Sequence, residues 1–305
     1  MVEGILPIWK EKGMTSFACV SRVRHLLGIK KVGHAGTLDP EVEGVLPIAV
    51  GAGTKVLEYM LEADKTYIGE ITLGYSTSTE DATGQIVEKW PVSKDIRAEE
   101  IDEVLAGFVG NIEQVPPMFS AVKIKGKKLY EYAFEGIEID RPARKVRIYE
   151  MKRTSELMYE ETTETLRFSF EVSCSKGTYI RTLAVDIGKK LGYPAHMSEL
   201  TRVKSGDINA EQTWTLGEVE TAVSAGTVEK LLLPIDYGLA DFPRISIDEK
   251  LWKRVKNGAI LDEKDIKAEN YPVLFIYNET IVALYDKHPN KIGKLKPQKM
   301  FRVEM

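Results

Sequence analysis

The chain has 305 residues, of which 43% are hydrophobic and 29% are charged, and this length supports one large globular domain and a small one. No apolar run approaches the roughly 18 residues that cross a membrane, and the first residues lack the basic start and long apolar core of a signal peptide. The two cysteines lie far apart, and none of the four histidines is four residues from another, which argues against a disulfide and a metal site. We therefore expect a cytoplasmic protein with buried thiols and no metal.

The charges are distributed unevenly. A formal net charge of −4 and a pI of about 5.8 argue, by themselves, against a nucleic-acid-binding protein. Lysine and arginine nevertheless outnumber aspartate and glutamate by six to three in residues 1–40, ten to five in 120–153 and six to two in 285–305. A globally acidic protein can still present a basic face. Such segments are also typical of ordinary solvated surface, so charge alone leaves RNA binding open.

The first predicted elements lie on either side of a glycine-rich loop. Residues 15–27 predict an amphipathic helix that Thr15 or Ser16 caps and Gly28 ends. Its expected apolar stripe is Phe17, Val20, Val23 and Leu27. The stretch G33-H-A-G-T-L-D-P40 then predicts a loop. Residues 65–74 predict a strand, with one face formed by Tyr67, Gly69, Ile71 and Leu73.

The middle of the chain mixes helices and strands without regular βαβ spacing. Residues 97–109 and 178–191 have the apolar periodicity of helices, and residues 145–151 and 165–174 predict strands. The second strand alternates cleanly between apolar and polar positions, with Leu166, Phe168, Phe170, Val172 and Cys174 on one face. This order favours an α+β fold around a central mixed or antiparallel sheet flanked by helices.

The character of the chain changes between Leu232 and Pro243. A short helix over residues 248–257 is followed by strands at 273–276 and 281–285, which a turn at N278-E-T280 joins as a hairpin. We therefore expect two domains, residues 1–238 and a small β-rich module of residues 239–305.

Asp39 is the most interesting polar residue of the glycine-rich loop. Pro40 biases it away from helix, and Gly33 and Gly36 allow the chain to bend and to approach a ligand closely. An aspartate in such a turn commonly bonds to its own backbone. Taken alone, the loop leaves both a turn residue and a reactive carboxylate open.

Six ordered motifs resemble those of one family, the bacterial tRNA pseudouridine-55 synthases, or TruB family. They run through residues 4–235 as K31-V-G-H-A-G-T-L-D-P40 with E43-G-V-L-P47, D64-K-T-Y67, T79-E-D-A-T-G84, V115-P-P-M-F-S-A-V-K-I-K-G-K-K-L-Y-E-Y132, S175-K-G-T-Y-I-R-T-L-A-V-D186 and L200-T-R202. The tail from about Pro243 is similar to a PUA domain, a small pseudo-barrel found with RNA-modifying enzymes. The opening I8-W-K-E-K-G-M-T-S16 departs from the family by having glutamate where proline is common, but keeps Lys10.

The resemblance implies a pseudouridine-synthase fold and isomerisation of the T-loop uridine at tRNA position 55. The N1–C1′ bond is broken, the uracil rotates, and a C5–C1′ bond forms, without redox change or group transfer. No cofactor is therefore expected. The implied partner is the T stem-loop of tRNA, and we expect a monomer because the basic face must stay free for RNA.

The resemblance also assigns roles to individual residues. Asp39 would be the essential carboxylate, leaving open attack at C6 or C1′ and proton abstraction at C2′. Arg181 would hold it through a bidentate fork, and Tyr67 would stack on the uracil and help to remove the C5 proton. His34 would fill the gap that the flipped base leaves. The other residues expected to bind substrate are Tyr179, Leu200, Lys10, Arg202 and Asp81.

Three alternatives remain at this point. An RNA-binding or RNA-folding protein could use the same surface without essential catalysis. A guide-RNA-dependent pseudouridine synthase shares the fold and a PUA domain. The tight spacing of the bacterial-type motifs favours the stand-alone enzyme, and a requirement for guide RNA would separate the two. A hydrolase with Asp39 as nucleophile is the third, but neither a paired general acid nor a Gly-x-Ser-x-Gly elbow supports it.

Overall fold

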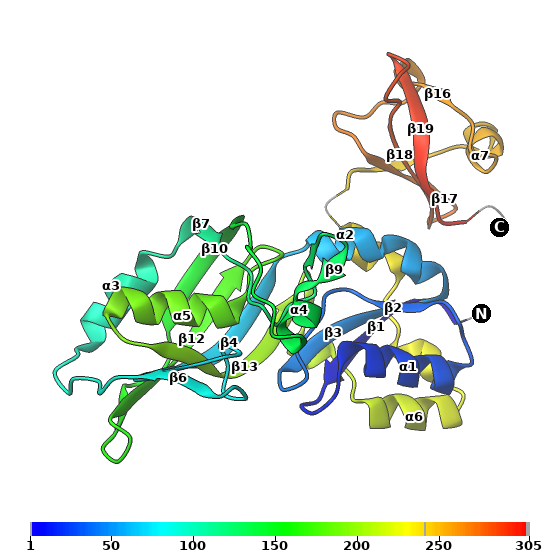
Figure 1. The fold of residues 1–305 in the computed structure, drawn as a ribbon. Helices are drawn as coiled ribbons and strands as arrows, with labels where there is room; N and C mark the ends of the chain where they lie inside the picture. The colour runs from blue at the N-terminus through cyan, green and yellow to red at the C-terminus, as the bar shows by residue number, and fades with distance from the viewer. Residues whose placement is uncertain (1, 241, 303–305) are drawn as a thin grey trace.

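Two β-sheets organise this computed structural model, which describes residues 2–240 and 242–302 (Figure 1). Among the described residues, the larger sheet has ten strands. Its main path is β1 (Gly4–Lys10), β3 (Glu43–Val50), β13 (Ala195–Ser205), β4 (Lys65–Leu73), β12 (Thr165–Cys174), β10 (Arg144–Arg153) and β7 (Gly110–Gln114). Three short strands extend it, namely β2 (Val32–His34), β11 (Met158–Glu160) and β14 (Ile208–Asn209). Only the β3–β13 pair of the main path is parallel, so the sheet is mixed, as predicted.

Helices cover the two halves of this sheet separately. The helix α1 (Ser16–Leu27) contacts α6 (Leu216–Ser224) beside β1 and β3, whereas α3 (Ala98–Ala106) and α5 (Ile180–Leu191) pack on the other half (Figure 1). The remaining helices are α2 (Leu57–Glu62), α4 (Leu129–Phe134) and α7 (Glu249–Val255). Short 3₁₀ turns are η1 (Gly51–Val56), η2 (Ala210–Gln212), η3 (Val228–Leu231), η4 (Ile235–Leu239) and η5 (Glu263–Asp265). The α+β class is confirmed.

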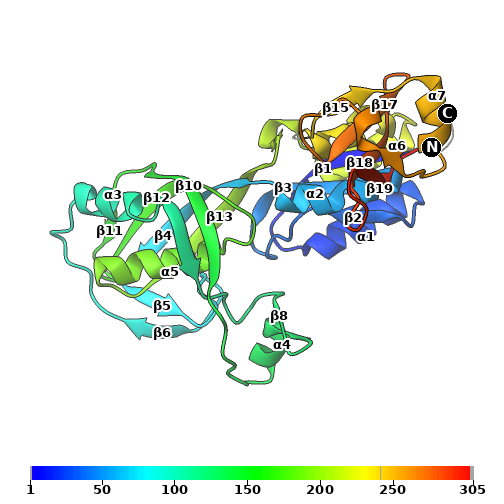
Figure 2. The same cartoon turned by 90° about the horizontal axis from the view of Figure 1, so that it is seen from above.

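Two small hairpins lie outside the large sheet. One pairs β5 (Tyr75–Thr77) with β6 (Ile86–Lys89), and the other pairs β8 (Lys123–Ile124) with β9 (Lys127–Lys128). The second hairpin and α4 form an arm, here defined as residues 121–143, which projects away from the sheet in Figure 2. The backbone of the arm therefore lies outside the large sheet.

The C-terminal module, here residues 242–302, contains the second sheet. Its strand order is β15 (Arg244–Ser246), β17 (Val273–Tyr277), β18 (Thr280–Lys287), β19 (Lys294–Met300) and β16 (Leu261–Asp262). The predicted hairpin is confirmed, because Tyr277 pairs with Thr280 across a two-residue turn. Asn278 and Glu279 both have positive φ in that turn, as a type I′ hairpin requires. The boundary at residues 238 and 239 remains a prediction.

Several predicted elements are correct and others need correction. In β12 the alternating face is confirmed, since each of its five apolar residues is at most 3% exposed. The stripe predicted for α1 is wrong at Phe17, which is 65% exposed, while Cys19 is buried in its place. The helix predicted over 97–109 ends at Ala106 because Gly107 caps it. The helix predicted over 178–191 begins only at Ile180. The central strand β13 escaped prediction because two bulges shift its alternation.

Candidate active site

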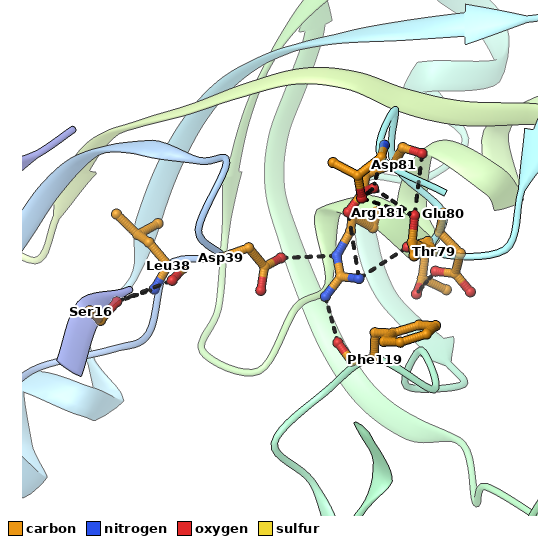
Figure 3. Close-up of polar contacts among 10 residues, drawn as sticks. Ser16, Leu38, Asp39, Thr79, Glu80, Asp81, Phe119 and Arg181 are labelled. Atoms are coloured by element: carbon orange, nitrogen blue, oxygen red, sulfur yellow. Dashed lines mark hydrogen bonds and ion pairs between the residues drawn. The ribbon is translucent and has the colours of Figure 1, made fainter. Parts of the chain in front are cut away.

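The loop that carries Asp39 connects β2 to β3 and is fixed from α1. Ser16, in the first turn of α1, donates its hydroxyl to the Leu38 carbonyl at 3.1 Å and accepts from the Leu38 amide at 2.9 Å (Figure 3). The next residue along the chain is Asp39. A two-way bond to the preceding residue therefore fixes the backbone from which the carboxylate projects.

Lys10 supports the far side of the same loop. Its side chain is fully buried at the end of β1, and its ammonium donates to the carbonyls of Glu11, Met14 and Pro40. The three donors of a lysine are thereby used. Desolvation lowers the pKa of Lys10. We predicted that Lys10 binds substrate, and this geometry favours a positioning role instead.

Arg202, from β13, holds the middle of the loop. It is 1% exposed, and it donates from Nε to the Val45 carbonyl at 2.8 Å and from Nη2 to the Gly36 carbonyl at 3.1 Å. Gly36 has a φ of +98° and lies so close that a Cβ would be 3.4 Å from the guanidinium. Only glycine adopts this backbone without strain. Arg202 therefore joins the parallel β3–β13 pair to the loop.

Arg181 and Asp39 form the ion pair at the centre of the site. Arg181 Nε lies 3.0 Å from Asp39 Oδ2, with the arginine side chain 6% and the aspartate side chain 42% exposed. The expected bidentate fork is wrong. Arg181 instead donates from Nη1 to the Thr79 carbonyl at 3.0 Å and from Nη2 to the Phe119 carbonyl at 2.8 Å (Figure 3). One guanidinium thus joins α5 to three separate loops.

Asp81 stands behind this pair. Its Oδ2 is 3.9 Å from Arg181 Nη1, and its Oδ1 accepts from the hydroxyls of Thr79 and Thr83 and from the Thr83 amide. The carboxylate therefore shapes its own turn and adds negative charge beside the arginine. We predicted that Asp81 binds substrate, and these contacts favour support of Arg181.

The environment of Asp39 acts on its pKa in opposite directions. Desolvation raises the pKa of Asp39, the Arg181 guanidinium lowers it, and the charge of Asp81 raises it, so that the pKa lies above its usual range. The ion pair is thus too weak to offset desolvation entirely. A carboxylate that is poorly solvated in its ionised form is a stronger base and nucleophile than a carboxylate in water.

Asp39 lies on the wall of a cavity of about 280 Å³. The predicted residues that line this cavity are Asp39, Tyr67, Tyr179, Arg181, Leu200 and Arg202. Burial raises the pKa of Tyr67, so its phenol stays protonated at neutral pH. Tyr67 can therefore donate a hydrogen bond or stack, but it does not hold a phenolate ready as a base. The structure thus brings together six predicted residues, from the three elements β4, α5 and β13 and from two loops, on the walls of a single cavity.

His34 lies at the end of β2, outside the residues that line the cavity. Its Nδ1 is buried and has no hydrogen-bond partner among the described residues. Desolvation lowers the pKa of His34, which favours the neutral ring. A neutral planar ring suits stacking in RNA.

Three residues of the site carried no usable signal in the sequence. Gln114 ends β7 and is 2% exposed, and its amide pairs with both the N–H and the carbonyl of Tyr179. Lys65 lines the cavity, donates to the carbonyls of Leu61 and Ala63, and desolvation lowers its pKa to about 8. Ser120 also lines the cavity. All three lie in or beside the quoted motifs, but a single glutamine, lysine or serine has no spacing pattern that points to a site.

Residues 24–180 match the profile of the TruB family pseudouridylate synthase N-terminal domain, and residues 181–240 match that of the tRNA pseudouridylate synthase B C-terminal domain. The chain belongs to the TruB family of pseudouridylate synthases. The site spans both TruB profiles, since Asp39 and Tyr67 fall in the first and Arg181 and Leu200 in the second.

Relatives of this TruB-family chain match it over nearly its whole length. A tRNA pseudouridine synthase B from Halalkalibacterium halodurans is 50% identical over 299 residues, covering 97% of each chain. One from Bacillus subtilis is 50% identical over 304 residues, covering 98% of each. Among solved structures, a Cbf5-Nop10-Gar1 complex contains a chain with a TM-score of 0.73 and 27% identity, covering 98% of this chain and 85% of that one. The fold is therefore that of the pseudouridine synthases.

Three further expectations concern the thiols, a membrane span and a metal site. Cys19 and Cys174 are free and buried. Within residues 2–240 and 242–302, no helix is long and apolar enough to cross a membrane, and no group of three or more His, Cys, Asp and Glu residues could hold a metal ion.

Proposed function

We propose that this chain isomerises the uridine at position 55, in the T stem-loop of tRNA, to pseudouridine, with Asp39 as the essential carboxylate. The observation that carries the proposal is the Asp39–Arg181 pair on the wall of a cavity that also contains Tyr67. Membership of the TruB family and full-length relatives named tRNA pseudouridine synthase B support it.

The reaction balances without another reactant. The N1–C1′ bond breaks and a C5–C1′ bond forms, while C5 loses a proton and N1 gains one. The product is an isomer, so no electron donor, acceptor or transferred group is required. Asp39 acts at the base or the ribose, and Arg181 keeps its carboxylate aimed. The protonated phenol of Tyr67 stacks on the uracil or donates a hydrogen bond to it.

The target base must leave its stack to reach Asp39, at a cost of about a few kcal/mol. We propose that the ring of His34 takes part of the place it vacates. Tyr179 and Leu200, on the cavity wall, contact the base after it enters.

The arm offers the RNA a surface of cations and aromatic rings. Lys127 Nζ lies 4.9 Å from the centre of the Tyr132 ring, and Lys128 Nζ lies 5.2 Å from that of Tyr130. Phe134 is 79% exposed. Phosphates attract the lysines, and unpaired bases stack on exposed rings. We propose that the arm binds the T stem-loop. We also propose that the protein works as a monomer without metal, so that the arm and the cavity stay free for RNA.

The guide-dependent alternative is weaker. The Cbf5 structure is a complex with Nop10 and Gar1, but the matched chain is only 27% identical to this one, against 50% for relatives named as tRNA enzymes. A requirement for guide RNA is the property that separates the two functions.

The test is tritium release from tRNA transcripts labelled at C5 of uridine, with no guide RNA added. The proposed enzyme releases about one tritium per tRNA, and it releases none from a matched transcript with cytidine at position 55. Binding without release would favour the RNA-folding alternative, and release only after addition of a guide RNA would favour the guide-dependent one.

A further inference from the structure

Ser120 lines the catalytic cavity, and its buried hydroxyl has no hydrogen-bond partner among the described residues. The residue is 5% exposed, lines the cavity, and lies just before the arm. Its backbone is satisfied, because its N–H donates to the Met118 carbonyl at 3.0 Å and its carbonyl accepts from the Tyr130 amide at 3.1 Å. Within residues 2–240 and 242–302, its Oγ has no hydrogen-bond partner.

The position of Ser120 is tied to the catalytic pair. The carbonyl of the preceding residue, Phe119, accepts the 2.8 Å bond from Arg181 Nη2, and the same guanidinium pairs with Asp39 (Figure 3). The amide of Tyr130 holds the following peptide. The backbone of Ser120 is therefore fixed relative to Asp39, although its hydroxyl makes no bond of its own.

Two other hydroxyls of this cavity, those of Ser175 and Thr178, have hydrogen-bond partners within the protein. Ser175 accepts from the Arg147 amide at 2.9 Å, and Thr178 donates to the Ser175 carbonyl at 2.9 Å. A buried hydroxyl without a partner destabilises a folded protein. Folding stability therefore does not explain a serine at position 120, whereas a ligand that enters the cavity would supply the missing hydrogen-bond partner.

The chemistry of uracil indicates which partner. One edge of the ring presents a carbonyl oxygen, N3–H and a second carbonyl oxygen. Rotation about the axis through N3 and C6 exchanges N1 with C5, as the isomerisation requires, and also exchanges O2 with O4. A fixed donor therefore meets a carbonyl oxygen at the same point before and after the rotation.

We propose that Ser120 donates a hydrogen bond to a carbonyl oxygen of the flipped uracil and retains an equivalent bond in the product orientation. The inference rests on the proposed function. Ser120 is then a substrate-contact residue that stabilises the flipped base within the bound complex. Because phosphate contacts dominate the affinity for RNA, its loss lowers kcat and leaves the Kd for tRNA unchanged.

The first experiment compares wild type with Ser120→Ala. The expected result is a fall in kcat of about tenfold, an unchanged Kd for tRNA, and a Tm equal to or above that of wild type. Ser120→Thr, which keeps a hydroxyl, recovers part of the rate. Ser155→Ala is the control, since Ser155 lies outside the cavity and its hydroxyl accepts from the Ser169 amide and donates to the Glu156 carbonyl. The control lowers Tm and leaves kcat unchanged.

A second experiment replaces the target uridine by 4-thiouridine and, separately, by 2-thiouridine, because sulfur is a weaker acceptor than oxygen. One of the two substitutions should slow wild type more than it slows Ser120→Ala, since the variant has no bond to weaken. Equal slowing in both proteins for both substrates would overturn the inference, as would an unchanged kcat or a lowered Tm in Ser120→Ala. A wild type that releases no tritium would instead overturn the proposed function.

Discussion

Buried cations surround the loop that carries Asp39, and most of them lack a carboxylate partner. Among the described residues, Arg181 pairs with Asp39, whereas Lys10, Lys65 and Arg202 have no carboxylate within 4.0 Å and bind backbone carbonyls. The backbone carbonyls accept the hydrogen bonds of these cations but do not neutralise their positive charge. Such a site is prepared for a negatively charged ligand, as RNA is.

Arg181 should be needed to orient the Asp39 carboxylate and to favour its ionised form. Replacement by methionine removes the ion pair and the bonds to Thr79 and Phe119, so we expect kcat/KM to fall about 100-fold. Arg181 is the strongest influence that lowers the pKa of Asp39. Its loss should therefore raise that pKa further and move the acid limb of the rate profile to higher pH.

The measurement is the pH dependence of kcat/KM for wild type, Arg181→Met and Arg181→Lys. In wild type the acid limb should already lie above the ordinary aspartate value of 3.8. Arg181→Lys keeps the charge but cannot make all three contacts, so it should give an intermediate rate. A methionine variant with the wild-type rate and an unmoved acid limb would contradict this account of the pair.

Lys65 should make the free energy of unfolding rise with pH in the alkaline range. Burial lowers its pKa from 10.5 to about 8, so between these pH values the unfolded chain binds more protons than the folded one. The free energy of unfolding therefore gains a contribution that rises with pH across this window. Lys65→Met lacks that contribution.

The check is urea unfolding of wild type and Lys65→Met at pH 7.5 and pH 9.5. Wild type should gain on the order of 1 kcal/mol relative to the variant between the two values. The comparison cancels the titration of groups that both proteins share. Parallel pH dependences would show that Lys65 titrates normally.

At the scale of elements, residues from three different elements fix one loop. The N-terminus of α1 contributes Ser16, the end of β1 contributes Lys10, and β13 contributes Arg202. The β3–β13 pair depends on Gly44, which has a φ of +124° and lies so close to Arg202 that a Cβ would be 2.2 Å from its carbonyl oxygen. Strand pairing and loop position are therefore coupled at this glycine.

Gly44→Ala should be more destabilising than an alanine at another left-handed glycine. Besides backbone strain, it forces apart two strands, an overpacking effect of about 1–3 kcal/mol. Gly192→Ala is the matched control, because Gly192 caps α5 with a φ of +84° and a Cβ at that position would point into open space. Thermal unfolding of both variants is the measurement, and an equal loss of Tm would contradict the coupling.

How much the sequence predicts varies with the kind of interaction. Clean periodicity located α1, α5 and β12, and the motifs led to Asp39 and Arg181. The bidentate fork was wrong because Thr79 and Phe119 contact Arg181 through backbone carbonyls, which every residue has. The roles of Lys10 and Arg202 depend on carbonyls in the same way. Backbone contacts of this kind follow from the tertiary arrangement and leave no trace in residue identity.

For the whole molecule, the C-terminal module is docked on the body by several contacts. Leu274 and Leu284 share an apolar cluster with Ile5, and Lys55 Nζ donates to the Met300 carbonyl at 2.7 Å. Lys299 lies 2.6 Å from Glu58 of α2. The module thus sits above α2, and the arm projects from another part of the body (Figures 1 and 2). An RNA held by both would meet the cavity in a fixed orientation.

The arm should supply electrostatic affinity without chemistry. Lys123 and Lys125 are exposed, and neither has an ion-pair partner within 4.0 Å in the described part of the chain. Their joint replacement by alanine should weaken tRNA binding. It should also reduce the slope of log K against log salt by about 0.7–0.9 for each lost phosphate contact. The rate at saturating tRNA should stay near that of wild type.

Lys94→Ala with Arg97→Ala is the control for that double variant. Lys94 and Arg97 are exposed cations just before α3, and they pair with Glu161 and Glu100. Their replacement removes the same number of positive charges from a part of the surface away from the arm. The control should keep the wild-type salt slope, measured by filter binding over a series of salt concentrations. Equal slopes for both double variants would show that the arm is not a phosphate-binding surface.

The most direct test of the central claim is tritium release by Asp39→Asn beside wild type, with tRNA binding measured in parallel. Asparagine keeps the size of the side chain and removes its charge. We expect wild type to release about one tritium per C5-labelled tRNA, the variant to release none, and both proteins to bind tRNA with similar affinity. A variant that releases tritium at close to the wild-type rate would contradict the claim that Asp39 is the catalytic carboxylate.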